Sequence, residues 1–164
     1  MHPPVGPAWL VWVETSAVAV AMRQWLWLYP IVEIVHIVGF VVLVGAAVLF
    51  DLRLLGVSRH LSVTSMAGYL LPWARASLVL VVPSGLLMFS AHATEMADNP
   101  AFRLKLTGLV VAGLNVALFH RGPFTSVRAW DHDVVAPVTA RVAALASLLL
   151  WMGIIACGRL LAYF

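Results

Sequence analysis

Charged residues are scarce in this chain of 164 residues: 10% are Asp, Glu, Lys or Arg, against 63% hydrophobic residues. A soluble domain of this size carries about 25% charged residues. So few charges cannot cover a surface that faces water, and we therefore expect the lipid bilayer to be the solvent. The net charge of +3 is scattered near the ends of apolar stretches. That distribution is typical of membrane topology and argues against nucleic acid as a partner.

Cysteine is nearly absent as well. Cys157 is the single cysteine, which excludes an internal disulfide and a cysteine-based metal cluster. The signatures of common enzymes are also missing, because the chain has no Gly-rich phosphate loop, no Gly-x-Ser-x-Gly and no His-Glu-x-x-His. The sequence therefore favours a protein without catalytic activity over an enzyme.

Four apolar stretches are each long enough to cross a bilayer core of about 30 Å as a helix. They lie at about residues 27–50, 69–90, 101–120 and 138–160. Because short connectors separate them, we predict a single all-α transmembrane domain over residues 25–164, an up-down-up-down four-helix bundle. Residues 1–24 precede it as a loop and a helix, and we expect that helix to lie along the membrane interface. A fifth span there is the alternative.

The positive-inside rule gives the orientation. It compares the basic residues expected on the two faces, five against four: Arg53, Arg59, Arg121, Arg128 and Arg141 on one, and Arg23, Arg103, Lys105 and Arg159 on the other. The difference predicts that both termini lie on the outer, periplasmic side.

Two ionisable residues, Glu33 and His36, lie inside the first span and share one helical face. An ionisable side chain in a membrane is costly, and its presence is a hypothesis of function. The helical rise of about 1.5 Å per residue puts Glu33 at a depth similar to Lys105 and Arg159, which predicts a buried charge cluster. A second cluster is predicted near the opposite face, from Asp51, Arg75 and Arg141. Such clusters either hold helices together or form an ion path or a site for an anionic ligand.

The histidine in the first span is the candidate ligand for a metal or for haem. His36 lies roughly 13 Å inside the span, and neutral imidazole is a common haem ligand. Met152 is the soft ligand predicted nearest to that depth. His92 and His120 lie near the two faces, and a pair of histidines is the alternative. The cofactor that we expect is haem b, against a purely structural role for His36.

Several strings in the chain resemble a family of small bacterial integral membrane proteins that is a domain of unknown function. The strings are Pro30-x-x-Glu33-x-x-His36, Asp51-Leu52-Arg53-Leu54-Leu55-Gly56, Leu70-Leu71-Pro72-Trp73, Phe102-Arg103-Leu104-Lys105, Gly113-Leu114-Asn115, Phe119-His120 and Gly158-Arg159-Leu160-Leu161-Ala162-Tyr163. The resemblance implies a four-helix protein of the bacterial inner membrane. A looser likeness in architecture is to cytochrome b-type and copper-resistance membrane proteins, and architecture alone does not carry function.

Three functions follow as hypotheses. The leading one is a small electron-transfer subunit that binds haem b through His36 and contacts other membrane redox subunits. The second is a module that transports ions, protons or a metal, in which a polar route is lined by Glu33, His36, Lys105, Asn115 and Arg75. The third is a structural subunit of a larger membrane complex, and assembly into an oligomer is compatible with all three.

Overall fold

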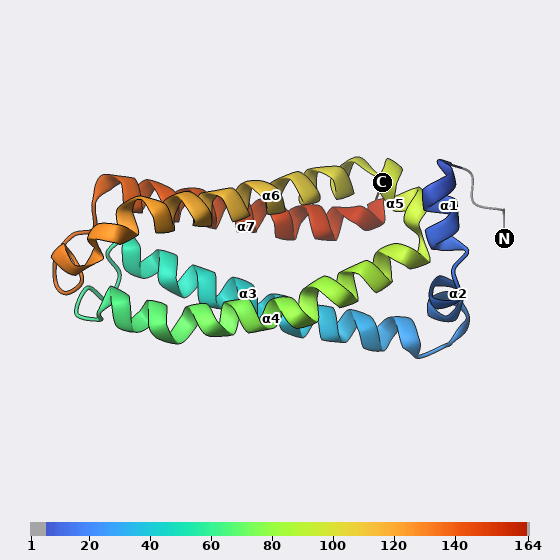
Figure 1. Cartoon of the computed structure of the whole chain (residues 1–164), viewed down its shortest axis with the longest axis horizontal. Helices are drawn as coiled ribbons and strands as arrows, with labels where there is room; N and C mark the ends of the chain where they lie inside the picture. The colour runs from blue at the N-terminus through green and yellow to red at the C-terminus, as the bar shows by residue number, and fades with distance from the viewer. Residues whose placement is uncertain (1–5, 164) are drawn as a thin grey trace.

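The structure, a computed structural model, describes residues 6–163, and these residues form helices and connecting loops without strands. Four long helices run side by side along the longest axis of the molecule (Figure 1). Each of the four is long and apolar enough to cross a membrane. They are α3 (Leu28–Leu54), α4 (Val63–Ala91), α6 (Pro100–Arg121) and α7 (Val138–Leu160). The predicted four-helix bundle is confirmed.

The N-terminal segment forms two short helices at one end of the bundle, α1 (Ala8–Glu14) and α2 (Ala17–Gln24) (Figure 1). Ser16 caps the start of α2, because its hydroxyl accepts a hydrogen bond from the backbone N–H of Ala19. At about 1.5 Å of rise per residue, neither helix is long enough to cross a hydrocarbon core of about 30 Å. The structure therefore does not form the fifth span that was the alternative.

Two hydrogen-bonded contacts hold these short helices against the bundle. The carboxylate of Glu14 accepts hydrogen bonds from the backbone N–H and the hydroxyl of Thr94, at 2.8 and 2.7 Å. Thr94 lies at the start of α5 (Ala93–Asp98), the short helix between α4 and α6. Arg23 donates to the carbonyl of Ala91, at 2.7 Å, where α4 ends.

Three of the long helices, α3, α4 and α6, extend past their predicted ends, whereas α7 keeps the predicted bounds. Asn99 caps the start of α6, because its side chain accepts hydrogen bonds from two backbone N–H groups and Pro100 follows at the first helical position. Ser62 caps the start of α4, because its hydroxyl accepts a hydrogen bond from the backbone N–H of Ser65, and the helix continues through both Pro72 and Pro83. The connector after α6 forms a 3₁₀ helix, η1 (Pro123–Ala129), and a second one, η2 (Leu161–Tyr163), follows α7.

The four long helices form two hairpins, α3 with α4 and α6 with α7. The hairpins meet mainly through α3 and α7. The largest cluster of buried apolar side chains lies at the end of the bundle that holds η1, around Phe50, Leu54, Val63, Phe119 and Trp130. The middle of the bundle has a smaller cluster around Leu43 and Trp151.

Candidate functional site

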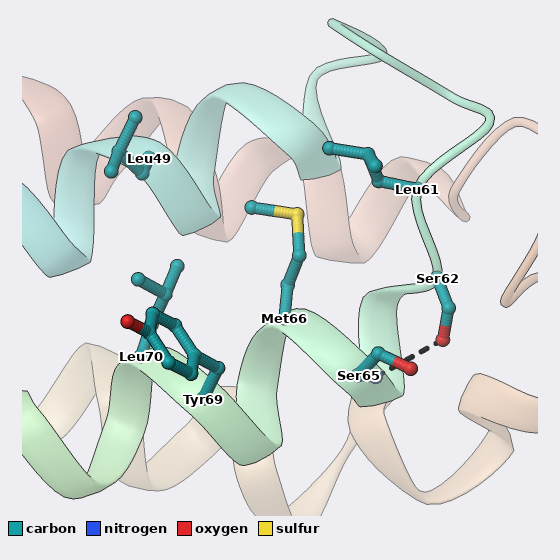
Figure 2. Close-up of a pocket in the computed structure, with 7 residues that line it drawn as sticks. All are labelled: Leu49, Leu61, Ser62, Ser65, Met66, Tyr69 and Leu70. Carbon is teal, nitrogen blue, oxygen red and sulfur yellow. Dashed lines mark hydrogen bonds between the residues drawn. The ribbon is translucent and has the colours of Figure 1, made fainter.

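A cavity of about 1490 Å³ lies between the two hairpins, and all four long helices contribute to its wall. Most of the residues that line it are apolar. Near α5, the wall is closed by the stacked rings of Phe89 on α4 and Phe102 on α6, whose centroids are 5.4 Å apart. A second, smaller pocket of about 260 Å³ lies between the end of α3 and the start of α4 (Figure 2). Tyr69 is the only ionisable residue in that small pocket, so the large cavity is the candidate site.

His36 lines the large cavity and is held in place by α4. Its Nδ1 atom lies 3.1 Å from the carbonyl oxygen of Val81 and 3.0 Å from the hydroxyl of Ser84. A carbonyl oxygen can only accept, so Nδ1 carries the proton in the bond to Val81. Nε2 makes no hydrogen bond within residues 6–163. The imidazole therefore presents an unused nitrogen in a fixed orientation.

Small and aromatic residues shape the space around this imidazole. A Cβ atom at Gly85 would lie 3.1 Å from Cε1 of His36, so the glycine leaves room for the ring. Phe40 stacks with His36 at a centroid distance of 6.4 Å, and Trp151 of α7 meets Phe40 edge-on at 6.0 Å. The imidazole thus faces a cavity with aromatic walls.

The first predicted charge cluster lies on the wall of the same cavity. Glu33, Lys105 and Arg159 all line it. The ammonium of Lys105 lies beside α7, 3.8 Å from the place where a Cβ of Gly158 would be. Arg159 donates to the hydroxyl of Tyr163 at 3.0 Å. Among the described residues, the ion pairs within 4.0 Å do not include any between Glu33 and these two cations.

The second predicted cluster is divided between the cavity and the outer surface. Asp51 and Arg75 line the cavity, whereas Arg141 is exposed and lies outside its wall. Arg75 donates to the carbonyl of Leu71 in its own helix, at 3.4 Å. Asp51 is only 6% exposed, and the hydroxyl of Ser147 approaches its carboxyl group.

The other candidate iron ligands do not share the surroundings of His36. Met152 is 68% exposed and lies outside the cavity wall. His92 lies near α5, where its Nδ1 atom is 3.7 Å from the carboxylate of Glu95. His120 does line the cavity, but it lies near the end of α6 that is remote from the start of α3 (Figure 1). Within residues 6–163, no group of three or more His, Cys, Asp or Glu side chains is arranged to hold a metal ion.

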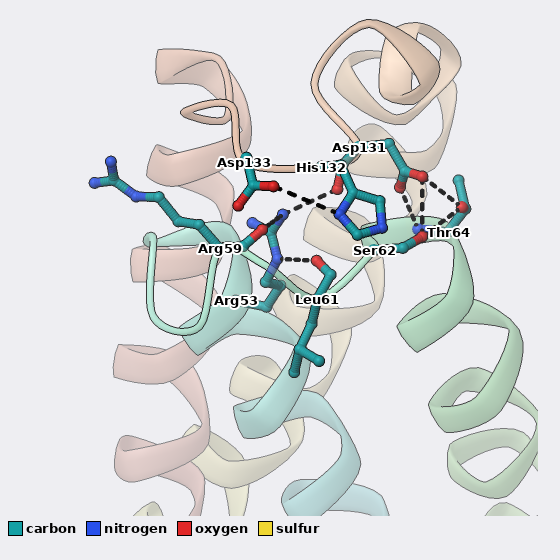
Figure 3. Close-up of polar contacts among 8 residues, drawn as sticks. All are labelled: Arg53, Arg59, Leu61, Ser62, Thr64, Asp131, His132 and Asp133. Atoms are coloured by element: carbon teal, nitrogen blue, oxygen red, sulfur yellow. Dashed lines mark hydrogen bonds and ion pairs between the residues drawn. The ribbon is translucent and has the colours of Figure 1, made fainter.

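A hydrogen-bonded network at the loop end of the bundle was not predicted from the sequence (Figure 3). Arg53 is 1% exposed and donates to three backbone carbonyls: to Leu61 at 2.6 Å, and to Arg59 and Asp131 at 2.9 Å each. The guanidinium therefore joins the end of α3 to both loops at that end. The signal was present in the string Asp51-Leu52-Arg53, which places a cation in the last turn of a span.

Asp131 is the second member of this network and caps α4 from a distant loop (Figure 3). Its carboxylate accepts hydrogen bonds from the backbone N–H of Thr64 at 2.7 Å and from the hydroxyls of Ser62 and Thr64. Burial by itself raises the pKa of Asp131, but these hydrogen bonds outweigh it and hold the pKa below its ordinary value. A negative charge there also suits the positive end of the helix dipole.

Four apolar helices packed around a cavity, with short polar connectors, define the class: a multi-pass α-helical membrane protein. The chain belongs to a family of unknown function, DUF6644, whose model matches residues 9–164. Comparison with curated proteins and with solved structures finds no match. Function must therefore be argued from the site itself.

Proposed function

We propose that the large cavity binds haem b, with His36 as the iron ligand, and that the protein transfers electrons within the membrane. The observation that carries this proposal is the hydrogen bond from Nδ1 of His36 to the carbonyl of Val81. Histidine ligands of metals usually donate their second ring N–H in this way, which fixes the tautomer and the ring orientation. Nδ1 is occupied by this bond, so Nε2 is the ring nitrogen that remains to bind iron, and His36 lines the cavity.

The chemistry of the cavity wall suits this group. A haem has a flat apolar body, for which Phe40 and Trp151 offer aromatic surfaces. It also has carboxylate groups, which Lys105 and Arg159 can neutralise from the same cavity. When bound, the haem supplies one-electron redox chemistry, and the burial and hydrogen bonding of its ligand tune the potential.

His36 is the single protein ligand in this proposal. Met152 faces away from the cavity, and His92 and His120 lie toward the two ends of the bundle. The residues around His36 would hold the ring and exclude water. Other membrane redox subunits would donate and accept the electrons.

A transport module is the second candidate, and one observation favours it. The polar residues that would line an ion route, Glu33, His36, Lys105, Asn115 and Arg75, all line this one cavity. The mainly apolar wall argues against it, because an ion needs continuous polar groups to replace its water. Haem binding therefore accounts for more of the cavity than ion transport does.

The experiment is a reduced-minus-oxidised visible spectrum of the protein purified in detergent and supplied with haem. The wild type should show the Soret and α bands of a b-type haem, and His36→Ala should lose them. His132→Ala is the matched control, because that side chain is 59% exposed in a loop. A wild type that stays colourless, or a His36→Ala variant with full absorbance, would contradict the proposal.

A further inference from the structure

Asp51 is a buried acid that the haem proposal does not use. It is 6% exposed on α3, and its Oδ2 atom has no hydrogen-bond partner among residues 6–163. The side chain belongs to the wall of the large cavity. A buried acceptor without a partner is destabilising, because it has lost its bonds to water. Its position on the wall of a cavity points to a ligand that supplies the missing donor.

Two more polar side chains lie at the same level of the bundle. Ser147 of α7 brings its hydroxyl toward the carboxyl of Asp51. Asn115 of α6 donates to the carbonyl of Ala143 at 3.0 Å, one helical turn before Ser147. All three polar side chains line the cavity. Three helices thus contribute a carboxyl, a hydroxyl and a carboxamide to one part of its wall.

The described cations do not neutralise this carboxyl group. Arg75 bonds to the carbonyl of Leu71, and Arg141 lies outside the cavity wall. The nearby guanidinium of Arg53 is directed to the loop carbonyls of Leu61, Arg59 and Asp131. Oδ2 of Asp51 therefore remains free to accept a hydrogen bond from a ligand.

The length of the cavity and its apolar wall determine what kind of ligand can fill it. Asp51 follows His36 by 15 residues on the same helix, a distance of about 22 Å along its axis. The wall that α3 provides between them is apolar, with Phe40, Leu43 and Ala46 among its members. A ligand that fills this space has an apolar body and one polar end.

We infer that Asp51, Ser147 and Asn115 bind the hydroxyl head group of a lipid-soluble ligand whose apolar body lies along the cavity. The ligand hydroxyl donates to Oδ2 of Asp51. The hydroxyl of Ser147 and the carboxamide of Asn115 orient the head group. This site lies at the other end of the cavity from His36 and does not depend on haem.

The test compares two probes on the wild-type protein in detergent: decylhydroquinone, kept reduced under argon, and its dimethyl ether. The two share an apolar body, but only the hydroquinone can donate a hydrogen bond. Because a ligand that binds the folded state raises the melting temperature, circular dichroism melts at increasing probe concentration give the affinities. The hydroquinone should bind about tenfold more tightly than the ether, because its hydroxyl gives the buried acceptor a hydrogen bond that the ether cannot supply. Equal affinities would overturn the inference.

Variants locate the site. Asp51→Asn should lose most of the preference for the hydroquinone, and Ser147→Ala should lose part of it. The control is Glu95→Gln, at a carboxylate that is 80% exposed outside the cavity wall and should keep the full preference. An Asp51→Asn variant that keeps the preference would overturn the assignment. If that variant fails to fold, Ser147→Ala and the two probes on the wild type decide the question. A colourless preparation that still prefers the hydroquinone would reject haem binding while supporting this site.

Discussion

The loop end of the bundle and the cavity both contain charged side chains, but these side chains differ in their hydrogen-bond partners. At the loop end, Arg53 is buried against three carbonyls and Asp131 accepts from three donors. Glu33 of α3 and Lys105 of α6 both line the cavity, without an ion pair between them among the described residues. Charges of the first kind hold the fold together. Charges of the second kind are exposed to whatever fills the cavity.

The largest expected difference between these regions is in the free energy of unfolding that is lost when a cation is removed. Arg53→Met leaves the carbonyls of Leu61, Arg59 and Asp131 without their donor, and we expect a loss of about 3–5 kcal/mol in the free energy of unfolding. Lys105→Met removes a cation that has no ion pair in residues 6–163 and should be close to neutral or stabilising.

Denaturant titration of both variants in detergent, followed by circular dichroism, measures these costs. Arg128→Met is the control for the loop end, since that arginine is exposed on η1. Equal losses for Arg53→Met and Lys105→Met would mean that the cavity cation is as structural as the loop one. The comparison between the two regions would then fail.

A smaller difference is expected between the packed surface that joins α3 to α4 and the cavity wall. A Cβ at Gly39 would lie 2.9 Å from Cβ of Leu80 and 2.9 Å from Cγ2 of Val81, so Gly39→Ala must push the two helices apart. We expect a cost of about 1–3 kcal/mol. Gly113 lines the cavity, and a Cβ there meets no atom within 4 Å.

Gly113→Ala is therefore the matched control, and its higher helix propensity should make it neutral or stabilising by up to about 1 kcal/mol. Thermal melts of the two variants decide the matter. A Gly113→Ala variant as unstable as Gly39→Ala would show that the cavity is closed in solution.

The sequence predicted the helices well because apolar length is a local property. The four spans and the position of His36 inside the first of them follow from composition and spacing alone. The bounds changed where a cap was decisive: Asn99 caps α6, which begins at Pro100, one residue before the predicted span. The division into two hairpins with a cavity between them depends on which helices pack together, and no local pattern encodes that.

Depth along a helix also could not give the direction in which a side chain points. Met152 was placed near the depth of His36, yet it lies on the outer surface of α7. Ser84 and Gly85 follow Pro83 inside the second predicted span. In the structure, the hydroxyl of Ser84 lies 3.0 Å from Nδ1 of His36, and Gly85 leaves room for the imidazole ring. Both roles appear only when α3 lies against α4.

The smallest effect that we predict concerns the pH dependence of the loop end. The pKa of Asp131 is held below its ordinary value of 3.8, so its charge stabilises the folded state above that pH. The stabilisation is lost as the pH falls below 3.8 and through the lower pKa of the folded state.

Asp131→Asn keeps one acceptor oxygen for Thr64 but removes the charge, and should lower the free energy of unfolding by about 1 kcal/mol at neutral pH. The melting temperatures of the variant and the wild type, measured between pH 7 and 2, should therefore converge at the acid end. Glu95→Gln, at an exposed carboxylate, is the control and should follow the wild type at every pH. A constant gap at every pH would mean that the shape of the Asp131 side chain, and not its charge, caps α4.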